Sequence, residues 1–316
     1  MVYQKDMLDD PYHELLKQIA SVEQHYPLQE LNPLKAGGIS DFFTVAKDTV
    51  ELASAVKGAL DAQIPYIVVG RAGGILFSDA GFPGLVIQNV SSSFAVAAEK
   101  SQVVADSGLP LSQFITLLAA RSLGGLTHLY GEQGTVGGSV YAGLSDGQQS
   151  ILSSVRYVTM FMPPTRMDKE ATIARYKVDW LMRESVTRLQ ELKMTLGIGQ
   201  SHSVILTVLF QLTSVRPDEI QTRLQEQMKR SPTGPGMGPI FCSLPDADIN
   251  SLLLGAGVAR LRVGNVFPDR YQPNYICSRG VAHSGDIRQL IERMQERVAI
   301  VYAVNLACRY EFAGVW

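Results

Sequence analysis

Cysteine, histidine and excess positive charge are all scarce in this sequence of 316 residues. Its three cysteines, Cys242, Cys277 and Cys308, form no Cys-x-x-Cys pair, which argues against both a disulfide framework and a zinc site. The 5 histidines show no His-x-x-x-His or His-Glu-x-x-His spacing, so no metal site is expected. With 28 Lys and Arg against 30 Asp and Glu, the chain has no basic excess to neutralise polymer phosphates, and nucleic-acid binding is not predicted.

Long apolar runs are missing as well. The longest, 204–209, is far shorter than the roughly 20 residues that span a bilayer. Residues 1–10 carry acidic side chains and no apolar core, so no export signal is expected. Because unpaired cysteines fit a reducing compartment, we expect a cytoplasmic protein without membrane contact.

The hydrophobic pattern that is present indicates a globular α+β chain, with 46% hydrophobic residues. Amphipathic spacing predicts helices over 8–24 and 49–62, and the β-branched run 65–70, which ends at Gly70, predicts a buried strand. Further strands are expected at 75–77, 85–88, 94–105, 155–161 and 204–213, further helices at 111–121, 178–193, 217–229, 249–257 and 287–298, and extended chain over 299–312.

The strongest linker signal is the run Ser231-Pro-Thr-Gly-Pro-Gly-Met-Gly-Pro239. A domain boundary is therefore expected nearby, close to residue 216. The chain divides on this basis into an N-terminal helix at 1–26, a larger domain at 27–215 and a C-terminal α+β domain at 216–316.

Two glycine-rich stretches carry the chemical information. Glycine has no Cβ, so backbone amides in such loops can turn toward an anion and hold phosphate oxygens. The first stretch follows a strand and precedes another strand, which is not the strand-to-helix context of a Rossmann fold. Tight turns between strands also use glycine for purely structural reasons, so either loop alone is weak evidence for anion binding. The candidate anion-binding residues are Gly70, Arg71, Ala72, Gly73 and Gly74 in the first stretch and Gly134, Thr135, Gly137, Gly138 and Ser139 in the second.

The order of these motifs resembles that of one family, the UDP-N-acetylenolpyruvoylglucosamine reductases (MurB-type). The segments at 37–41, 69–76, 79–87 and 131–141 are similar to the family's GGPA, LGGGSNLL, DxGFxGxVI and GIPGTVGGAVY. In the C-terminal part, Leu253-Leu-Gly-Ala-Gly257 also matches, and Gln272-Pro-Asn-Tyr275 is similar to the family's His-Ala-Asn-Phe. The resemblance covers about residues 30–314.

Membership implies an α+β fold with an FAD-binding region of the p-cresol methylhydroxylase (PCMH) type, made of two subdomains, and a C-terminal substrate domain. It implies non-covalent FAD, since Gly73 stands where related proteins tether the flavin to histidine. In the family, NADPH reduces FAD, which passes hydride to the enolpyruvyl ether of UDP-N-acetylglucosamine in peptidoglycan precursor synthesis. A UDP-sugar is thus the expected partner; no protein partner is indicated.

The resemblance also locates three departures at the family's catalytic arginine, serine and glutamate. Alignment on GYRxS puts Lys177 at the arginine and Asp179 at the serine of that motif. Alignment on GSVFKNP puts Pro239, which has no proton to donate, at the proton-donating serine. Alignment on ExEVRxxG, counted back from Gly314, puts Arg309 at the glutamate.

Two interpretations therefore stay open. The chain is either an active flavin oxidoreductase with altered proton delivery, or a catalytically degenerate relative that binds FAD or a nucleotide sugar. Cys242, Ser243 and Glu311 each lie near a lost catalytic position and are candidates to replace it. Arg71 either adds charge at a pyrophosphate or faces solvent.

Overall fold

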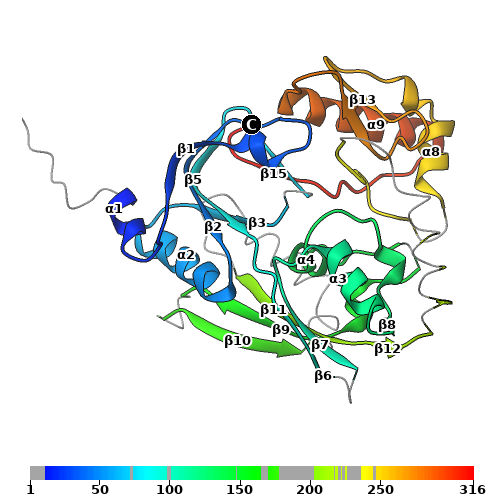
Figure 1. Cartoon of the computed structure of the whole chain (residues 1–316). Helices are drawn as coiled ribbons and strands as arrows, with labels where there is room; N and C mark the ends of the chain where they lie inside the picture. The colour runs from blue at the N-terminus through cyan, green and yellow to red at the C-terminus, as the bar shows by residue number, and fades with distance from the viewer. Residues whose placement is uncertain are drawn as a thin grey trace, which may run out of the picture.

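The computed structural model shows an α+β protein with two main β-sheets and a C-terminal α+β part (Figure 1). The predicted helix at 178–193 and most of the one at 217–229 lie outside the described residues. The described residues are 11–71, 74–97, 101–146, 148–164, 170–177, 203–216, 218, 219, 222, 225, 236–244 and 247–316.

The first sheet has four strands in the order β1-β2-β5-β3. Strands β2 and β3 each run parallel to β5, and β1 is antiparallel to β2. The predicted strands at 65–70 and 85–88 are confirmed as β3 and part of β5. The bounds are β1 Glu23–Pro27, β2 Ile39–Ala46, β3 Tyr66–Val69 and β5 Phe82–Asn89.

Helix α2 (Thr49–Asp61) connects β2 to β3 and confirms the prediction at 49–62. It begins where it does because the Asp48 carboxylate accepts hydrogen bonds from the amides of Val50 and Glu51. Its apolar face, with Leu52 and Val56 fully buried, packs in one cluster with residues of both sheets. The helix therefore lies between the two sheets (Figure 1).

The predicted helix over 8–24 is wrong in its second half. Helix α1 (Pro11–Leu16) is short, and β1 takes up residues that were expected to be helical. The reason is tertiary, because the Tyr26 ring stacks on Phe43 with centroids 3.7 Å apart and β1 pairs with β2. Part of the expected separate segment 1–26 therefore belongs to the first sheet.

The second sheet has five antiparallel strands in the order β10-β9-β11-β7-β6. Helices α3 (Leu111–Ala119) and α4 (Val136–Tyr141) pack on it, and the rings of Phe114 and Phe210 meet with centroids 5.3 Å apart. The predictions at 94–105, 111–121, 155–161 and 204–213 are confirmed to within a few residues. The bounds are β6 Phe94–Ala97, β7 Gln102–Asp106, β9 Val155–Met162, β10 Thr172–Lys177 and β11 Val204–Gln211.

The C-terminal part packs helices α8 (Ile249–Gly255) and α9 (Ser284–Tyr302) against a small hairpin, β13 (Val266–Pro268) and β14 (Ile276–Ser278). Helix α9 confirms and extends the prediction at 287–298, and the expectation of extended chain from 299 is wrong for its first four residues. The helix ends at Ala303, which has a positive φ of 54°. The Ala303 amide donates a hydrogen bond to the Ala299 carbonyl.

The last strand, β15 (Glu311–Ala313), returns to the first part of the chain and pairs in parallel with β4 (Ile75–Phe77). The C-terminus therefore ends beside the first glycine stretch (Figure 1). The expected boundary near 216 stays a prediction. The remaining elements are β8 Leu123–Gly124, β12 Thr213–Ser214 and the 3₁₀ turns Leu28–Leu31, Thr127–Leu129, Ile151–Ser154 and Val258–Arg260.

Gly81, just before β5, offers a test of this packing. Its φ is +90°, and a Cβ there would overlap the carbonyl oxygen of Ile39. We expect Gly81→Ala to lower the free energy of unfolding by about 1 to 3 kcal/mol, because both the backbone and the neighbouring strand oppose the added methyl. Urea denaturation measures this change. The control is Gly285→Ala in α9, where no atom lies within 4 Å of the added Cβ; equal losses in both variants would contradict the prediction.

Candidate functional site

The two glycine stretches, far apart in sequence, meet in the structure. A Cβ built on Gly70, at the end of β3, would lie 2.5 Å from Cγ2 and 2.7 Å from Oγ1 of Thr135. A second close approach involves Gly137, where an added Cβ would lie 2.6 Å from the Cβ of Ser107. Glycine is required at both positions because any side chain would force the segments apart. The order of motifs in the sequence did not reveal this direct contact.

The second stretch differs from the expected open loop. Thr135 is the N-cap of α4, and its hydroxyl accepts a hydrogen bond from the Gly138 amide at 3.3 Å. The Val136 and Gly137 amides donate to the carbonyls of Leu109 and Ser107, both at 2.8 Å. These amides have hydrogen-bond partners within the fold, and the assignment of Gly137 and Gly138 to cofactor binding stays a prediction.

The other candidate residues have different surroundings. Ser139 is buried, and its amide donates to the Thr135 carbonyl at 2.9 Å. Arg71 and Gly74 are exposed, and no heavy atom lies within 4 Å of a Cβ built on Gly74. Ala72 and Gly73 lie outside the described residues. The exposed backbone of the first stretch thus adjoins a closely packed second stretch.

The returning C-terminal strand contacts both stretches through Glu311. Its amide donates to the Gly74 carbonyl at 2.9 Å, and its carboxylate Oε1 accepts from the Tyr141 hydroxyl at 3.1 Å. Tyr141 is the last residue of α4. Burial raises the pKa of Tyr141, and the charge of Glu311 and the hydrogen bond to it raise that pKa further. Tyr141 therefore stays neutral and donates the bond.

A second cross-chain contact joins Arg309 to Glu132 in the second glycine stretch. Arg309 Nη2 lies 3.2 Å from Glu132 Oε2, and the two side chains are only 18% and 25% exposed. Tyr275 is close by: burial raises its pKa most, the charge of Glu132 adds to this, and Arg309 opposes it. The sequence motifs placed Arg309 but gave no sign of its partner.

Asn274 fixes the segment that follows Pro239. The buried Asn274 side chain accepts hydrogen bonds from the Ile240 amide at 3.1 Å and the Phe241 amide at 2.8 Å, and donates to the Phe241 carbonyl at 3.3 Å. Sequence reasoning placed Asn274 in a family motif without this role. The asparagine side chain thus provides partners for the buried Phe241 amide and carbonyl, while the Ile240 amide also donates to the Asn274 main-chain carbonyl at 2.9 Å.

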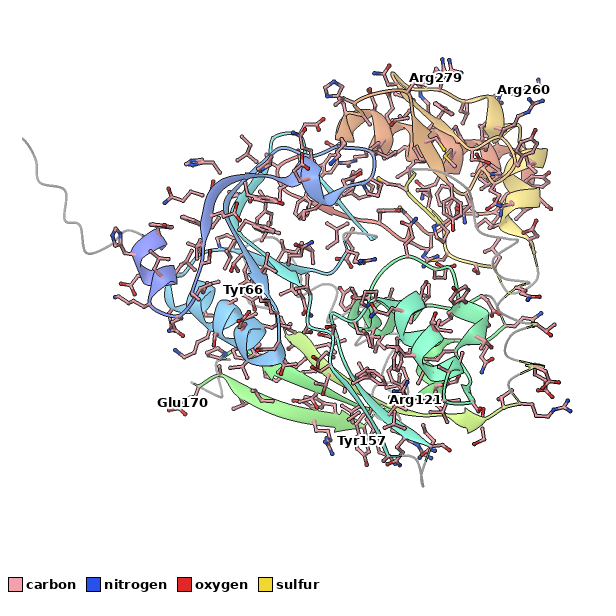
Figure 2. The ribbon with its side chains drawn as sticks, in the orientation of Figure 1. Tyr66, Arg121, Tyr157, Glu170, Arg260 and Arg279 are labelled. Carbon is pink, nitrogen blue, oxygen red and sulfur yellow. The ribbon has the colours of Figure 1, made fainter. Side chains whose placement is uncertain are left out.

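The three residues at the family's catalytic positions do not all come together. Pro239 and Arg309 lie in adjacent segments, since the Arg309 amide donates to the Ile240 carbonyl at 2.8 Å. Lys177 is exposed at the end of edge strand β10, where it pairs in register with Tyr157. Figure 2 shows Tyr157 at the opposite end of the molecule from Arg279 in the C-terminal part.

The described residues contain no group of three or more His, Cys, Asp or Glu side chains placed to hold a metal ion. In the same part of the chain, no helix is long and apolar enough to cross a membrane.

The fold and the glycine contact agree with comparisons to known proteins. The family model described as "FAD binding domain" matches residues 40–164, which include both glycine stretches. A solved structure of UDP-N-acetylenolpyruvylglucosamine reductase from Thermus caldophilus superposes with a TM-score of 0.71 at 22% identity, over 93% of this chain and 99% of that one. The chain is thus an FAD-binding α+β protein with a PCMH-type FAD-binding domain.

Sequence relatives define the family more closely. A UDP-N-acetylenolpyruvoylglucosamine reductase from Caldicellulosiruptor saccharolyticus is 27% identical over 301 residues, covering 91% of this chain and 90% of the relative. Reductase 1 from Bacillus cereus is 25% identical over 295 residues, covering 91% and 93%. Over about nine-tenths of its length the chain is therefore similar to UDP-N-acetylenolpyruvoylglucosamine reductases, and these comparisons support a divergent MurB-like FAD-binding oxidoreductase.

The contact between Gly70 and Thr135 can be tested through cofactor affinity. We expect Gly70→Ala to weaken FAD binding at least about tenfold, or ~1.4 kcal/mol, because the methyl pushes the glycine stretches apart. Thr135→Ala in the same chain should recover part of the loss, since the nearest remaining atom is the residue 135 Cβ at 3.2 Å. FAD titration of the apoprotein, followed by flavin fluorescence, measures both variants. Additive losses in the double variant would contradict the steric explanation.

Proposed function

We propose that the chain is an FAD-dependent oxidoreductase that uses NADPH to reduce the enolpyruvyl ether of UDP-N-acetylglucosamine, a step of peptidoglycan precursor synthesis. The observation that carries this proposal is the glycine contact at Gly70 and Thr135, in a chain whose relatives bear the name of that reductase. We propose a cytoplasmic location for the protein, because the nucleotide sugar and NADPH are both cytoplasmic molecules.

The chain's own residues fit a flavin dinucleotide. The exposed residues Arg71 and Gly74 are open to a pyrophosphate, and a side chain at the partly buried Gly70 would collide with Thr135. Arg71 supplies a positive charge at the same place, which favours the phosphate over the solvent-facing alternative. Non-covalent binding is proposed, and FAD supplies hydride transfer to the site when it is bound and reduced.

The C-terminal part is proposed as the substrate domain. Residues 236–316 provide Asn274, Tyr275, Arg309 and Glu311, which face the second glycine stretch or hold segments that do. A UDP-sugar between the two parts would therefore meet polar groups from both. The limits 27–215 for the FAD-binding domain and 216–316 for the substrate domain belong to this proposal.

Spectroscopy of the purified protein tests the proposed reaction in three steps. Addition of FAD should give a bound, yellow flavin, anaerobic NADPH should bleach it, and UDP-N-acetylglucosamine enolpyruvate should restore the colour. A protein that stays colourless after FAD addition does not bind the cofactor. A reduced protein that the enolpyruvyl sugar leaves bleached is not this reductase.

A degenerate FAD- or nucleotide-sugar-binding protein is the second candidate, and the Arg309–Glu132 pair favours it. The family glutamate is replaced by Arg309, and Glu132 stands where the family motif has isoleucine. The two substitutions contact each other at 3.2 Å, so the catalytic position is filled by an ion pair. Pro239, at the family's proton-donating serine, also has no proton to give.

Restoration of both family residues separates these candidates. If the chain is degenerate, the wild-type protein stops after reduction by NADPH, and the double variant Glu132→Ile, Arg309→Glu gains reoxidation by the enolpyruvyl sugar. Loss of a positioned acid typically costs about 10² to 10⁴ in rate, so the gain should be of that size. Stopped-flow absorbance of the flavin measures it. A wild-type protein that already reoxidises rapidly, with little gain in the double variant, would contradict degeneracy.

A further inference from the structure

Two charged residues have changed places on the returning strand. The family motif ExEVRxxG aligns with Ala307-Cys-Arg-Tyr-Glu-Phe-Ala-Gly314, so Arg309 stands at the glutamate and Glu311 at the arginine. Residues two apart on extended chain share one face. The site has therefore kept both charges on that face and exchanged their order.

Arg309 cannot take over the proton transfer of the missing glutamate. A guanidinium stays protonated in proteins, and this one is already held by Glu132 at 3.2 Å. Arg309 instead joins the C-terminal part to the second glycine stretch.

Ser243 and Cys242, the other two candidates to replace a lost catalytic group, form hydrogen bonds elsewhere. Ser243 is exposed, and its hydroxyl donates to the Ser145 carbonyl at 3.3 Å. Cys242 is exposed, and its amide bonds the Ala307 carbonyl at 2.9 Å. In the part of the chain that the structure describes, neither forms a hydrogen bond with Gly70, Gly74 or the residues of α4.

Glu311 lies where an acid would be needed. Its backbone is bound to Gly74, and it pairs in register with Ile75, so it adjoins the exposed part of the first stretch. Its carboxylate is bound to Tyr141 at the end of α4. Among the described residues, Oε2 accepts no hydrogen bond, which leaves one carboxyl oxygen available to a bound molecule.

We propose that Glu311 is the proton donor of this chain and that Tyr141 is its positioning residue. The proposal rests on the reductase function proposed above. When bound and reduced, FAD would supply the hydride that forms one C–H bond of the former enolpyruvyl double bond. The Glu311 carboxylate would take up a proton from water before the step and give it to the adjacent carbon as the π bond and the O–H bond break, which returns the carboxylate. NADPH supplies the two electrons.

Tyr141 suits the positioning role because it stays neutral. Burial keeps its pKa high, so the hydroxyl remains a donor and holds Oε1 of Glu311. Without that hydroxyl the carboxyl group remains but is free to rotate. Tyr141→Phe should therefore slow the reaction less than loss of the carboxyl group does.

The test compares Glu311→Gln, Glu311→Asp and Tyr141→Phe with the wild-type holoprotein. Glu30→Gln serves as the matched control, because Glu30 is an exposed glutamate and its carboxylate pairs with Lys35 at 3.0 Å. Stopped-flow absorbance measures reduction by NADPH and reoxidation by UDP-N-acetylglucosamine enolpyruvate separately. Redox titration gives the midpoint potential of bound FAD, which needs no turnover.

We expect Glu311→Gln to reoxidise about 10² to 10⁴ times more slowly, with NADPH reduction little changed. Glu311→Asp should recover part of that rate because it keeps the acid. Removal of a negative charge near the flavin should also make its midpoint potential more positive, since the reduced form carries more electron density. Glu30→Gln should match the wild type in all three measurements.

The outcomes separate this proposal from the proposed function. A wild-type protein that the enolpyruvyl sugar cannot reoxidise overturns the reductase function. If the wild type turns over and Glu311→Gln reoxidises within about threefold of it, the proton-donor role is overturned, since a general acid contributes about 10² or more. A midpoint potential that Glu311→Gln leaves at the wild-type value overturns the placement of Glu311 beside the flavin, whether or not the sugar reacts.

Discussion

The arrangement of the site depends on the close approach of the Gly70 backbone to Thr135. Gly70 ends a strand of the first sheet, and Thr135 caps the helix that covers the second sheet. Each sheet has its own apolar cluster, and a third cluster around α2 joins the two sheets, so the glycine contact adds to this packing in fixing their relative position. The missing Cβ is what allows the contact, and the exposed residues Arg71 and Gly74 follow Gly70 closely along the chain.

The parts of the fold that were predictable from sequence are those set by local chemistry. Helix α2 begins at the Asp48 cap, and β3 ends where its β-branched run meets Gly70. The parts that were not predictable are set by tertiary contacts. Strand β1 replaces a helical pattern because Tyr26 stacks on Phe43, and the end of α9 depends on the conformation of Ala303, a residue type that carries no stop signal.

The same distinction applies to the site. The glycines were predictable because only glycine allows a backbone to approach so closely, and their order along the chain resembles a known family. The side-chain contacts were not, because Tyr141 and Glu311 are 170 residues apart and Glu132 and Arg309 are 177 apart. Local sequence patterns carry no information about such pairs. They also gave no sign that α4 begins at Val136, or that the amides of Val136 and Gly137 donate to carbonyls within the fold.

The arginine at position 309 gives a physical reason for the carboxylate at position 132. An arginine at position 309 without a partner would be a charge with only 18% of its side chain exposed. Removal of one member of a buried ion pair typically lowers the free energy of unfolding by about 3 to 5 kcal/mol, and by less at this exposure. Glu132 supplies that partner, so the ion pair has a structural cause independent of catalysis. The ion pair therefore does not by itself show that catalysis is lost, because the exchange that created it also placed a carboxylate at 311, against Gly74 and Tyr141.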